Sequence, residues 1–305
     1  MHTYLDCVAC FVRQTVDVVS MVTPDPGLRE QAVREVLRAS AELNFAHVTP
    51  AAMGQRIHRL IRELTENPDP YREIKRRSNA AAMKLLPQVR SWLSDAADPF
   101  ETAVRLALAG NVIDFGVNHA TDVSDDGVGR MIAEAMEAPL SKAGVDRLRV
   151  RAHEARSILY LCDNAGEIVF DAILIEQLGP SKVRAAVRGG PIINDATLED
   201  ARSVGLDRLV TVLDSGCDAP GTILEQCTAE FREAFDDADL IIAKGQGNFE
   251  TLSGVEAPLF FLLKAKCPVI ARHIGCAEGR YLVLWHDDVK GRKDREAAGK
   301  EICDA

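Results

Sequence analysis

Two acids and an amide stand between a predicted strand and a predicted helix in the middle of the chain. Asp163, Asn164 and Glu167 follow the apolar run 157–162 and precede the apolar stretch 168–175. This pattern is typical of a buried parallel strand that turns into a helix, and open α/β sheets bind ligands at the carboxyl ends of such strands. Carboxylate and amide oxygens are hard ligands, which suit Mg²⁺ or Mn²⁺ better than zinc. The sequence therefore predicts a divalent-metal site after this strand.

Three further predicted strands also end in polar segments that contain glycine. The runs 183–187, 209–213 and 240–243 are followed by segments that hold Asp195, Asp218 and Lys244 in turn. Glycine lets the backbone approach a ligand closely and exposes N–H groups where a helix begins. We expect the four strand ends to form one cleft, lined by Asp163, Asn164, Asp195, Asp218 and Lys244.

Each of these residues also has an ordinary structural interpretation. Judged alone, Asp195 is about as typical of an N-terminal cap on the following helix as of a metal ligand. A lysine such as Lys244 is most often a solvated loop residue. Gly245 and Gly247 do not form the P-loop pattern and are a weak phosphate signal alone. The repetition of such segments at successive strand ends, where loops carry function, favours the functional interpretation.

Cysteine and glycine motifs elsewhere leave alternatives open. Cys7 and Cys10, the N-terminal cysteine pair, lie in a predicted helix and could share a metal, form a redox couple or be buried thiols. We expect the pair to anchor that helix rather than to be the catalytic centre, because no base or second ligand pair is near.

Asn111 and Asp114 follow a helix, where they suit a C-terminal turn or the wall of the cleft. Cys217 lacks a nearby histidine to activate it as a nucleophile.

Composition excludes several classes of protein. The 305 residues are 47% hydrophobic and carry a formal charge of −10 with a pI near 5.3. Such a charge argues against a nucleic-acid binder. It does not exclude a small phosphorylated substrate, because one metal ion and one lysine can balance the charge of a phosphate locally. No apolar run approaches the roughly 20 residues of a membrane span, and no signal peptide is visible. Eight cysteines without an export signal indicate reduced thiols or metal ligands in a cytoplasm.

The pattern of the chain changes near residue 155. Helical periodicity dominates the first hundred residues, as in 28–37 and 53–64, and continues through 99–155. Short apolar runs then alternate with helical stretches, and the last such run is 259–263. This alternation predicts a mostly parallel sheet flanked by helices. We expect a helical N-terminal domain at 1–98 and a Rossmann-like α/β domain at 99–305, packed closely because no flexible linker joins them.

Taken together, the motifs resemble the damage-control phosphatase family, also described as acidic-residue methyltransferase-like. The resemblance is carried by the N-terminal cysteine pair and by the segments 110–114, 162–167, 193–197, 218–222 and 244–250. These segments span nearly the whole chain in one order, and the cysteine pair resembles the stand-alone prokaryotic branch. The resemblance implies a helical N-terminal region on a Rossmann-like core. This chain differs from the family's pattern at Gln246, where eukaryotic members often have an acid.

The resemblance also implies a function and a set of site residues. It implies a phosphatase that depends on Mn²⁺, Mg²⁺, Co²⁺ or Ni²⁺ and acts on a small phosphorylated metabolite such as a sugar or cofactor phosphate. Asp163, Asn164 and Asp195 match the metal ligands, Lys244 matches the phosphate-contacting lysine, and Asp163 could also act as a base or nucleophile. We expect Asn111, Asp114, Glu167, Gly245, Gly247 and Asn248 to line the substrate site.

Two other functions stay open at this stage. One is a carboxyl methyltransferase that uses S-adenosylmethionine, although the usual G-x-G-x-G donor loop is absent. The other is a non-enzymatic protein that binds a metal or metabolite. The sequence does not determine the oligomeric state.

Overall fold

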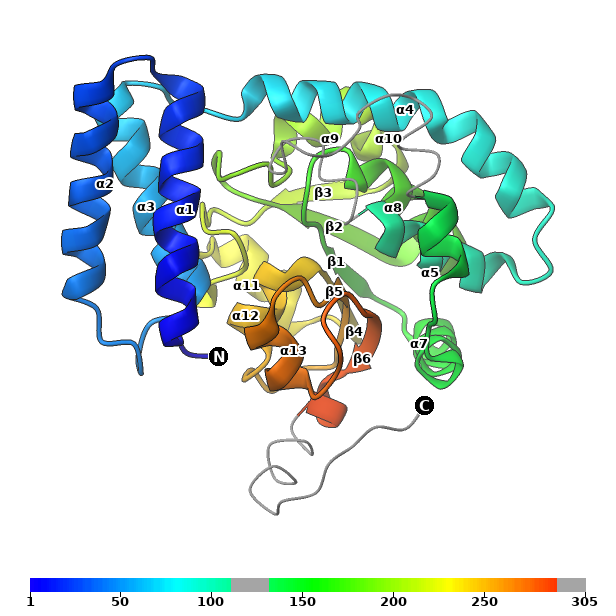
Figure 1. The fold of residues 1–305 in the computed structure, drawn as a ribbon. Coiled ribbons are helices and arrows are strands. Elements are labelled where there is room, and N and C mark those ends of the chain that lie inside the picture. Colours follow the sequence, from blue (N-terminus) through cyan, green and yellow to red (C-terminus); the bar gives the residue numbers. More distant parts are fainter. Residues whose placement is uncertain (111–131, 290–305) are drawn as a thin grey trace.

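A mostly parallel sheet forms the centre of the molecule (Figure 1). The computed structural model describes residues 1–110 and 132–289. Within them the strand order is β3-β2-β1-β4-β5-β6. The strands are β1 (Ile158–Leu161), β2 (Val183–Val187), β3 (Thr211–Asp214), β4 (Leu240–Lys244), β5 (Leu259–Lys264) and β6 (Tyr281–Trp285). Only β6 is antiparallel to its neighbour among these strands.

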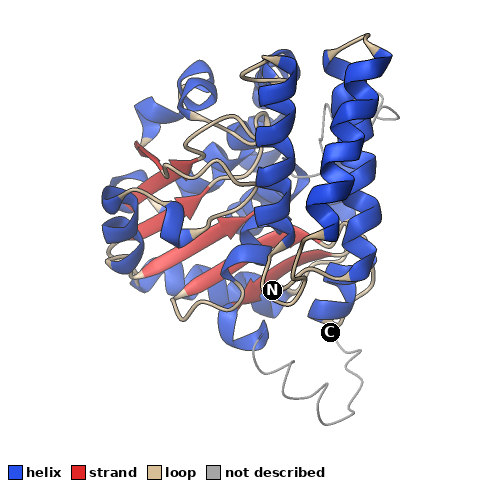
Figure 2. Ribbon diagram, turned by 90° about the vertical axis from the view of Figure 1, so that its left-hand side faces the viewer, coloured by secondary structure: helices blue, strands red, loops and turns tan. Residues whose placement is uncertain are grey.

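Helices cover both faces of the sheet, because side chains alternate along each strand and both sets are apolar (Figure 2). Ile158 and Tyr160 of β1 pack into one core, and Leu159 and Leu161 pack into another. The first core includes α4 (Arg72–Ser94), α5 (Pro99–Gly110), α7 (Lys142–Glu154), α8 (Glu167–Leu178), α9 (Leu198–Val204) and α10 (Leu206–Leu209). The second includes α11 (Ala229–Asp236), α12 (Gly245–Leu252) and α13 (Pro268–Ile274). Short 3-10 turns η1 (Pro180–Lys182) and η2 (Leu224–Gln226) complete the connections.

Three N-terminal helices form a separate small core beside the sheet (Figure 1). They are α1 (Leu5–Val22), α2 (Pro26–Ala41) and α3 (Pro50–Thr65). The helices α2 and α3 each begin with a capping side chain followed by proline, Asp25 before α2 and Thr49 before α3. No helix among the described residues is long and apolar enough to cross a membrane.

The predicted α/β fold is confirmed, with differences at its edges. The runs 158–161 and 183–187 are strands at the expected bounds, but the third strand begins later than predicted because 206–209 closes as a short helix. The strand β6 was not predicted. The boundary between domains stays a prediction, although α4 packs with the sheet rather than with the N-terminal helices.

Candidate active site

The structure brings Asp163, Asn164 and Asp195 together at the carboxyl ends of β1 and β2. The segment after β2 runs back beside the end of β1, where Asn164 and Asp195 form an isolated antiparallel bridge. Ala196 N donates to Asp163 O at 2.8 Å, and Ala165 N donates to Asn194 O at 2.9 Å. Backbone hydrogen bonds therefore fix the relative position of the three expected metal ligands, and their binding of a metal stays a prediction.

This group lies where the order of the sheet reverses. β1 has β2 on one side and β4 on the other, and the crevice between such strands is the usual ligand site of an open α/β sheet. Gly245, the first residue of α12 after β4, closes the crevice with φ of 76°. A Cβ atom at Gly245 would lie 1.9 Å from Asp163 Oδ2. Glycine is therefore required here both by its left-handed backbone and by the position of the carboxylate.

The structure decides between the two interpretations of Asp195. Thr197 is the residue before α9, and it forms a capping box with Asp200, whose Oδ2 accepts from Thr197 N at 3.0 Å. Asp195 is buried and instead accepts a hydrogen bond from Arg188 Nε at 2.7 Å. Asp195 is therefore not the helix cap, and its carboxylate belongs to the cleft.

Arg188 is a site residue that the sequence analysis missed. Its guanidinium is buried, lies 2.7 Å from Asp195 and 3.5 Å from Asp163, and donates to Asn248 Oδ1 at 3.1 Å. Arginine suits a buried position between carboxylates because its planar group spreads the charge over several donors. The only sequence signal was its position directly after a predicted strand.

Buried acids outnumber buried bases in this region. Four carboxylates (Asp163, Asp195, Glu167 and Asp171) lie with two cations (Arg188 and Lys244), all less than 10% exposed. The difference of two formal negative charges equals the charge of one divalent cation. Among the described residues no three His, Cys, Asp or Glu side chains are placed to hold a metal ion. The set expected here has two carboxylates and one amide oxygen, and these hard donors fit a divalent cation.

The charges of this group shift its ionisation. Burial raises the pKa of Asp163 well above its ordinary value, repulsion by Asp195 and Glu167 adds to the rise, and Arg188 and Lys266 oppose it. Burial also raises the pKa of Asp195, against the lowering effect of Arg188. Both carboxyls are therefore costly to ionise in the protein alone, and a nearby cation would favour their charged forms.

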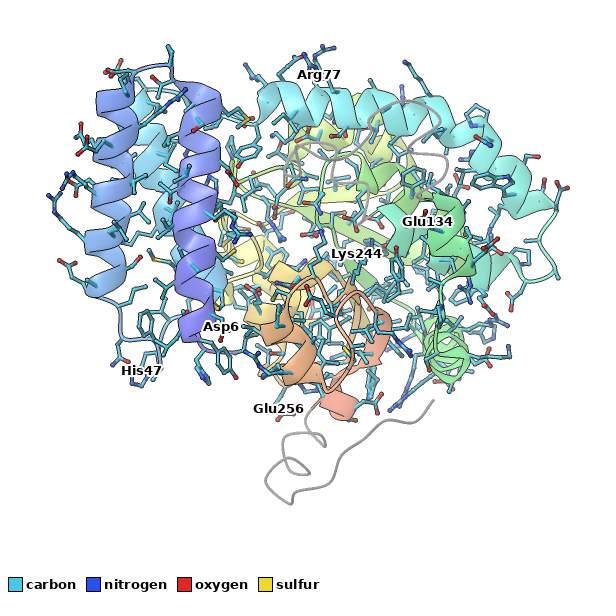
Figure 3. The ribbon with its side chains drawn as sticks, viewed as in Figure 1. Asp6, His47, Arg77, Glu134, Lys244 and Glu256 are labelled. Carbon is cyan, nitrogen blue, oxygen red and sulfur yellow. The ribbon has the colours of Figure 1, made fainter. Side chains whose placement is uncertain are left out.

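Lys244 is not a solvated loop residue, and its expected contact with a phosphate stays a prediction. It ends β4 and is fully buried (Figure 3), where its ammonium lies 2.6 Å from Glu167 Oε1 and 2.5 Å from Asp171 Oδ1. The third donor reaches Ala107 O at 2.8 Å. Burial acts to lower the pKa of Lys244, but the two carboxylates outweigh it and raise the pKa. Glu167 is equally enclosed, so neither side chain lines the cleft surface as we expected.

Asn248 and Gly247 have partners within the protein, and their expected role in the substrate site stays a prediction. The fully buried Asn248 donates to Lys244 O at 2.8 Å and accepts from Arg188 and from Thr222 Oγ1. A Cβ atom at Gly247 would lie 1.9 Å from Pro220 O. The glycine therefore permits close packing against the loop that follows β3. Asn111 and Asp114 lie outside the described residues.

Asp218 joins the loop after β3 to α3. Arg59 Nε donates to it at 3.0 Å, Arg62 Nη2 at 2.8 Å and Gln55 Nε2 at 2.7 Å. Burial acts to raise the pKa of Asp218, but these three donors outweigh it and lower the pKa to about 2. Asp218 therefore holds the N-terminal helices against the sheet, which corrects our expectation that it lines the cleft.

The N-terminal cysteine pair lies where α1 meets α12 and α13. Met1 N donates to Glu250 O at 2.7 Å, and Arg272 pairs with Asp6 at 3.1 Å. Cys7 is half-buried and Cys10 is exposed, and partial desolvation by the neighbouring helices raises the pKa of both thiols, with nearby Cys267 adding to the rise. Raised pKa values disfavour the reactive thiolate. The expected anchoring role stays a prediction that this placement supports.

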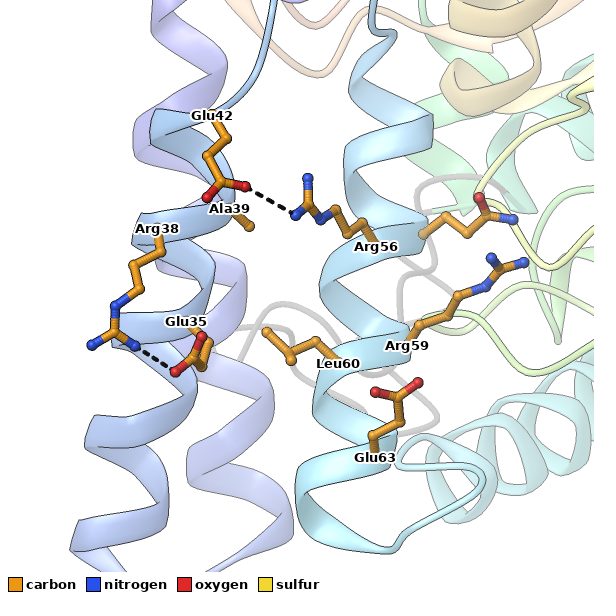
Figure 4. A pocket seen from close by; sticks show the side chains of 9 residues that line it. Glu35, Arg38, Ala39, Glu42, Arg56, Arg59, Leu60 and Glu63 are labelled. Carbon is orange, nitrogen blue, oxygen red and sulfur yellow. Dashed lines mark hydrogen bonds and ion pairs between the residues drawn. The ribbon is translucent and has the colours of Figure 1, made fainter.

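A groove of about 540 Å³ lies between α2 and α3 (Figure 4). Acidic and basic side chains line it together, including the ion pair between Arg56 and Glu42 at 3.6 Å. It contains none of the three expected metal ligands. The groove is therefore separate from the candidate site at the strand ends.

A mostly parallel sheet with buried acids at its reversal point is typical of α/β enzymes whose ligands bind at the carboxyl edge of the strands. Comparisons with known proteins identify the family within this class. Residues 3–282 match the damage-control phosphatase ARMT1-like domain. A damage-control phosphatase of Pyrococcus horikoshii is 38% identical over 93% of this chain and 98% of its own length. One from Archaeoglobus fulgidus is 37% identical over 90% of this chain and 95% of its own.

A solved structure agrees with these sequence matches. The crystal structure of a DUF89 family protein from Pyrococcus horikoshii superimposes with a TM-score of 0.83 and 36% identity. The match covers 94% of this chain and 99% of that one. The chain belongs to the ARMT1-like damage-control phosphatase family, a class of metal-dependent phosphatases. The predicted family and the predicted enzyme class are thereby confirmed.

Proposed function

We propose that Asp163, Asn164 and Asp195 hold one divalent cation and that the protein hydrolyses a small phosphorylated metabolite beside it. The observation that carries this proposal is the meeting of the three side chains at the reversal point of the sheet, with backbone hydrogen bonds between their segments. The excess of buried acids supports it, since a divalent cation would balance the charge. Mn²⁺, Mg²⁺, Co²⁺ and Ni²⁺ all suit such donors.

The protein's own residues would hold and orient the reacting groups. A bound cation would supply positive charge to a phosphoryl oxygen and offset the charge that develops there. Arg188 keeps Asp163 and Asp195 at fixed positions, through contacts at 3.5 Å and 2.7 Å. Lys266 is exposed after β5 and its charge acts on Asp163, so we assign to it the phosphate contact first expected of Lys244.

The cellular setting follows from the thiols. The seven cysteines among the described residues are free. Free thiols in such number support the reducing, cytoplasmic environment that we expected.

Metal binding and hydrolysis should be measured together on alanine variants. We expect the unaltered protein to bind one Mn²⁺ per chain by calorimetry and to hydrolyse at least one phosphoester in a panel of sugar and cofactor phosphates. Asp163→Ala and Asp195→Ala should lose tight binding and activity while remaining folded by circular dichroism. Asp214→Ala is the matched control, because Asp214 is an exposed acid that ends β3 without contacting the group.

The same measurements separate the competing assignments. Undiminished Mn²⁺ stoichiometry in Asp163→Ala would refute the metal site. A metal-loaded protein that hydrolyses nothing in the panel would favour a binding protein, and specific binding of the sulfonium methyl donor would favour a methyltransferase. Lys266→Ala should raise KM for the best substrate and leave the Mn²⁺ affinity unchanged.

A further inference from the structure

The chain of contacts behind Asn164 begins at the buried Lys244. An ammonium group has three hydrogen-bond donors, and those of Lys244 reach Glu167, Asp171 and Ala107 O within 2.8 Å. The side chains of Lys244, Glu167 and Asp171 are wholly removed from solvent. Lys244 therefore has no donor left for a phosphate, and its effect on the site must pass through one of its partners.

Glu167 is the partner that reaches the cleft. Its Oε1 binds Lys244 at 2.6 Å, and its Oε2 accepts from Asn164 Nδ2 at 3.0 Å. Asn164 Nδ2 also donates to Asp163 Oδ2 at 2.8 Å. Ionised carboxylates only accept hydrogen bonds, so the nitrogen of the amide must face Glu167 and the oxygen must face the other way. No described residue donates a hydrogen bond to that oxygen.

The other contacts of the group hold this chain in place. Asp171 accepts from Tyr160 OH at 2.7 Å. Gly166 N, two residues after Asn164, donates to Asn79 Oδ1 of α4 at 2.7 Å. Partners behind a metal ligand commonly fix its orientation, and their loss weakens metal binding about 10- to 100-fold.

We propose that Lys244 and Glu167 are positioning residues, which turn the amide oxygen of Asn164 toward the cation. This inference rests on the metal site proposed above. It replaces the expected phosphate contact of Lys244 with an indirect role. Lys244 holds Glu167, Glu167 holds the amide nitrogen of Asn164, and the oxygen is thereby directed to the metal.

Glu167→Gln tests this inference with little change in shape. A glutamine has one oxygen and one NH₂ group, so it can accept a hydrogen bond from Lys244 or from Asn164 but not from both. At the other contact two hydrogen-bond donors face each other. We expect Mn²⁺ affinity, measured by calorimetry without substrate, to fall at least tenfold. The affinity for inorganic phosphate at saturating Mn²⁺ should stay within twofold of the unaltered protein.

Tyr160→Phe is the matched control. It removes the hydrogen bond to Asp171 from the same buried group but leaves Glu167 and Asn164 untouched. It should lower the Tm while Mn²⁺ affinity stays within twofold. Equal loss of Mn²⁺ affinity in both variants would show that the group is only structural, and would overturn the proposal.

The outcomes also distinguish this inference from the proposed function. If the unaltered protein binds no Mn²⁺, the proposed metal site itself fails. If it binds one Mn²⁺ and Glu167→Gln binds equally tightly, only the positioning role fails. If Glu167→Gln does not fold, Glu167→Asp replaces it, since aspartate keeps the charge but is too short to span Lys244 and Asn164. A loss of Mn²⁺ affinity in Glu167→Asp would then support the positioning role, and unchanged affinity would refute it.

Discussion

The buried lysine of α4 offers a direct test of how α4 is joined to α9. Lys75 is 4% exposed and lies 3.0 Å from Asp69 and 3.2 Å from Asp200. Lys75→Met keeps most of the side-chain volume but leaves these carboxylates without their cation. Removing one partner of a buried ion pair costs about 3–5 kcal/mol. Because Asp200 keeps hydrogen bonds from Asn79 and Thr197, we expect a loss of about 3 kcal/mol.

Urea unfolding measures this loss. With a urea dependence of about 3 kcal/mol per M, the midpoint should fall by roughly 1 M. Tryptophan fluorescence and far-ultraviolet circular dichroism should give the same midpoint. Arg77→Met is the control, since Arg77 lies on the outer side of α4 (Figure 3) and its side chain is 71% exposed beside Glu73. Its midpoint should not move. A Lys75→Met midpoint equal to that of the control would refute the reasoning.

Three further predictions concern the site and its supports. Gly245→Ala should abolish tight Mn²⁺ binding in calorimetry because its Cβ would displace Asp163 Oδ2, whereas Gly254→Ala, with open space around it, should not. Asp218→Asn should destabilise the protein at pH 6. The pKa of Asp218 is lowered to about 2. The difference in unfolding free energy between the unaltered protein and this variant should therefore be complete above about pH 4 and should vanish as the pH falls through 2. Urea unfolding at several pH values measures this difference. Serine at both positions of the N-terminal cysteine pair should reduce stability or metal-dependent regulation and leave phosphoester turnover largely intact.

Each of these predictions has an outcome that contradicts it. Normal Mn²⁺ affinity in Gly245→Ala would mean that Asp163 is not the ligand. A stability difference for Asp218→Asn that is the same at pH 6 and pH 2 would show that its ion pairs contribute nothing. A folded, Mn²⁺-bound cysteine double variant without activity would place a thiol in the chemistry.

The sheet could be predicted because its strands are continuous apolar runs between helical stretches. A strand buried on both faces needs apolar side chains on both, and few other structures give that pattern. The edge strand β6 escaped because Tyr281 and Leu282 are only half-buried and it pairs on one side alone in the described structure. Its partner β5 is a continuous apolar run and is easily predicted. The sequence of β5 does not indicate on which of its sides another strand will pair.

The site could be predicted only in part, because burial is set by distant segments. Asp163, Asn164 and Asp195 each follow a predicted strand, and the topology of a parallel sheet brings such ends together. The burial of Lys244 was not predicted, because its partners lie 77 and 73 residues earlier in the chain. A lysine beside two glycines is usually solvated, and only the packing of α8 on the sheet shows that this one is enclosed.

The ion group of Lys244 has a consequence for the order in which the chain assembles. Glu167 and Asp171 lie on α8 and leave the ribosome well before β4, which carries their only buried cation among the described residues. Until β4 inserts beside β1, covering the sheet with α8 would bury two carboxylates without compensation. Because Lys244 compensates both carboxylates, we expect α8 to dock on the sheet only when β4 has inserted.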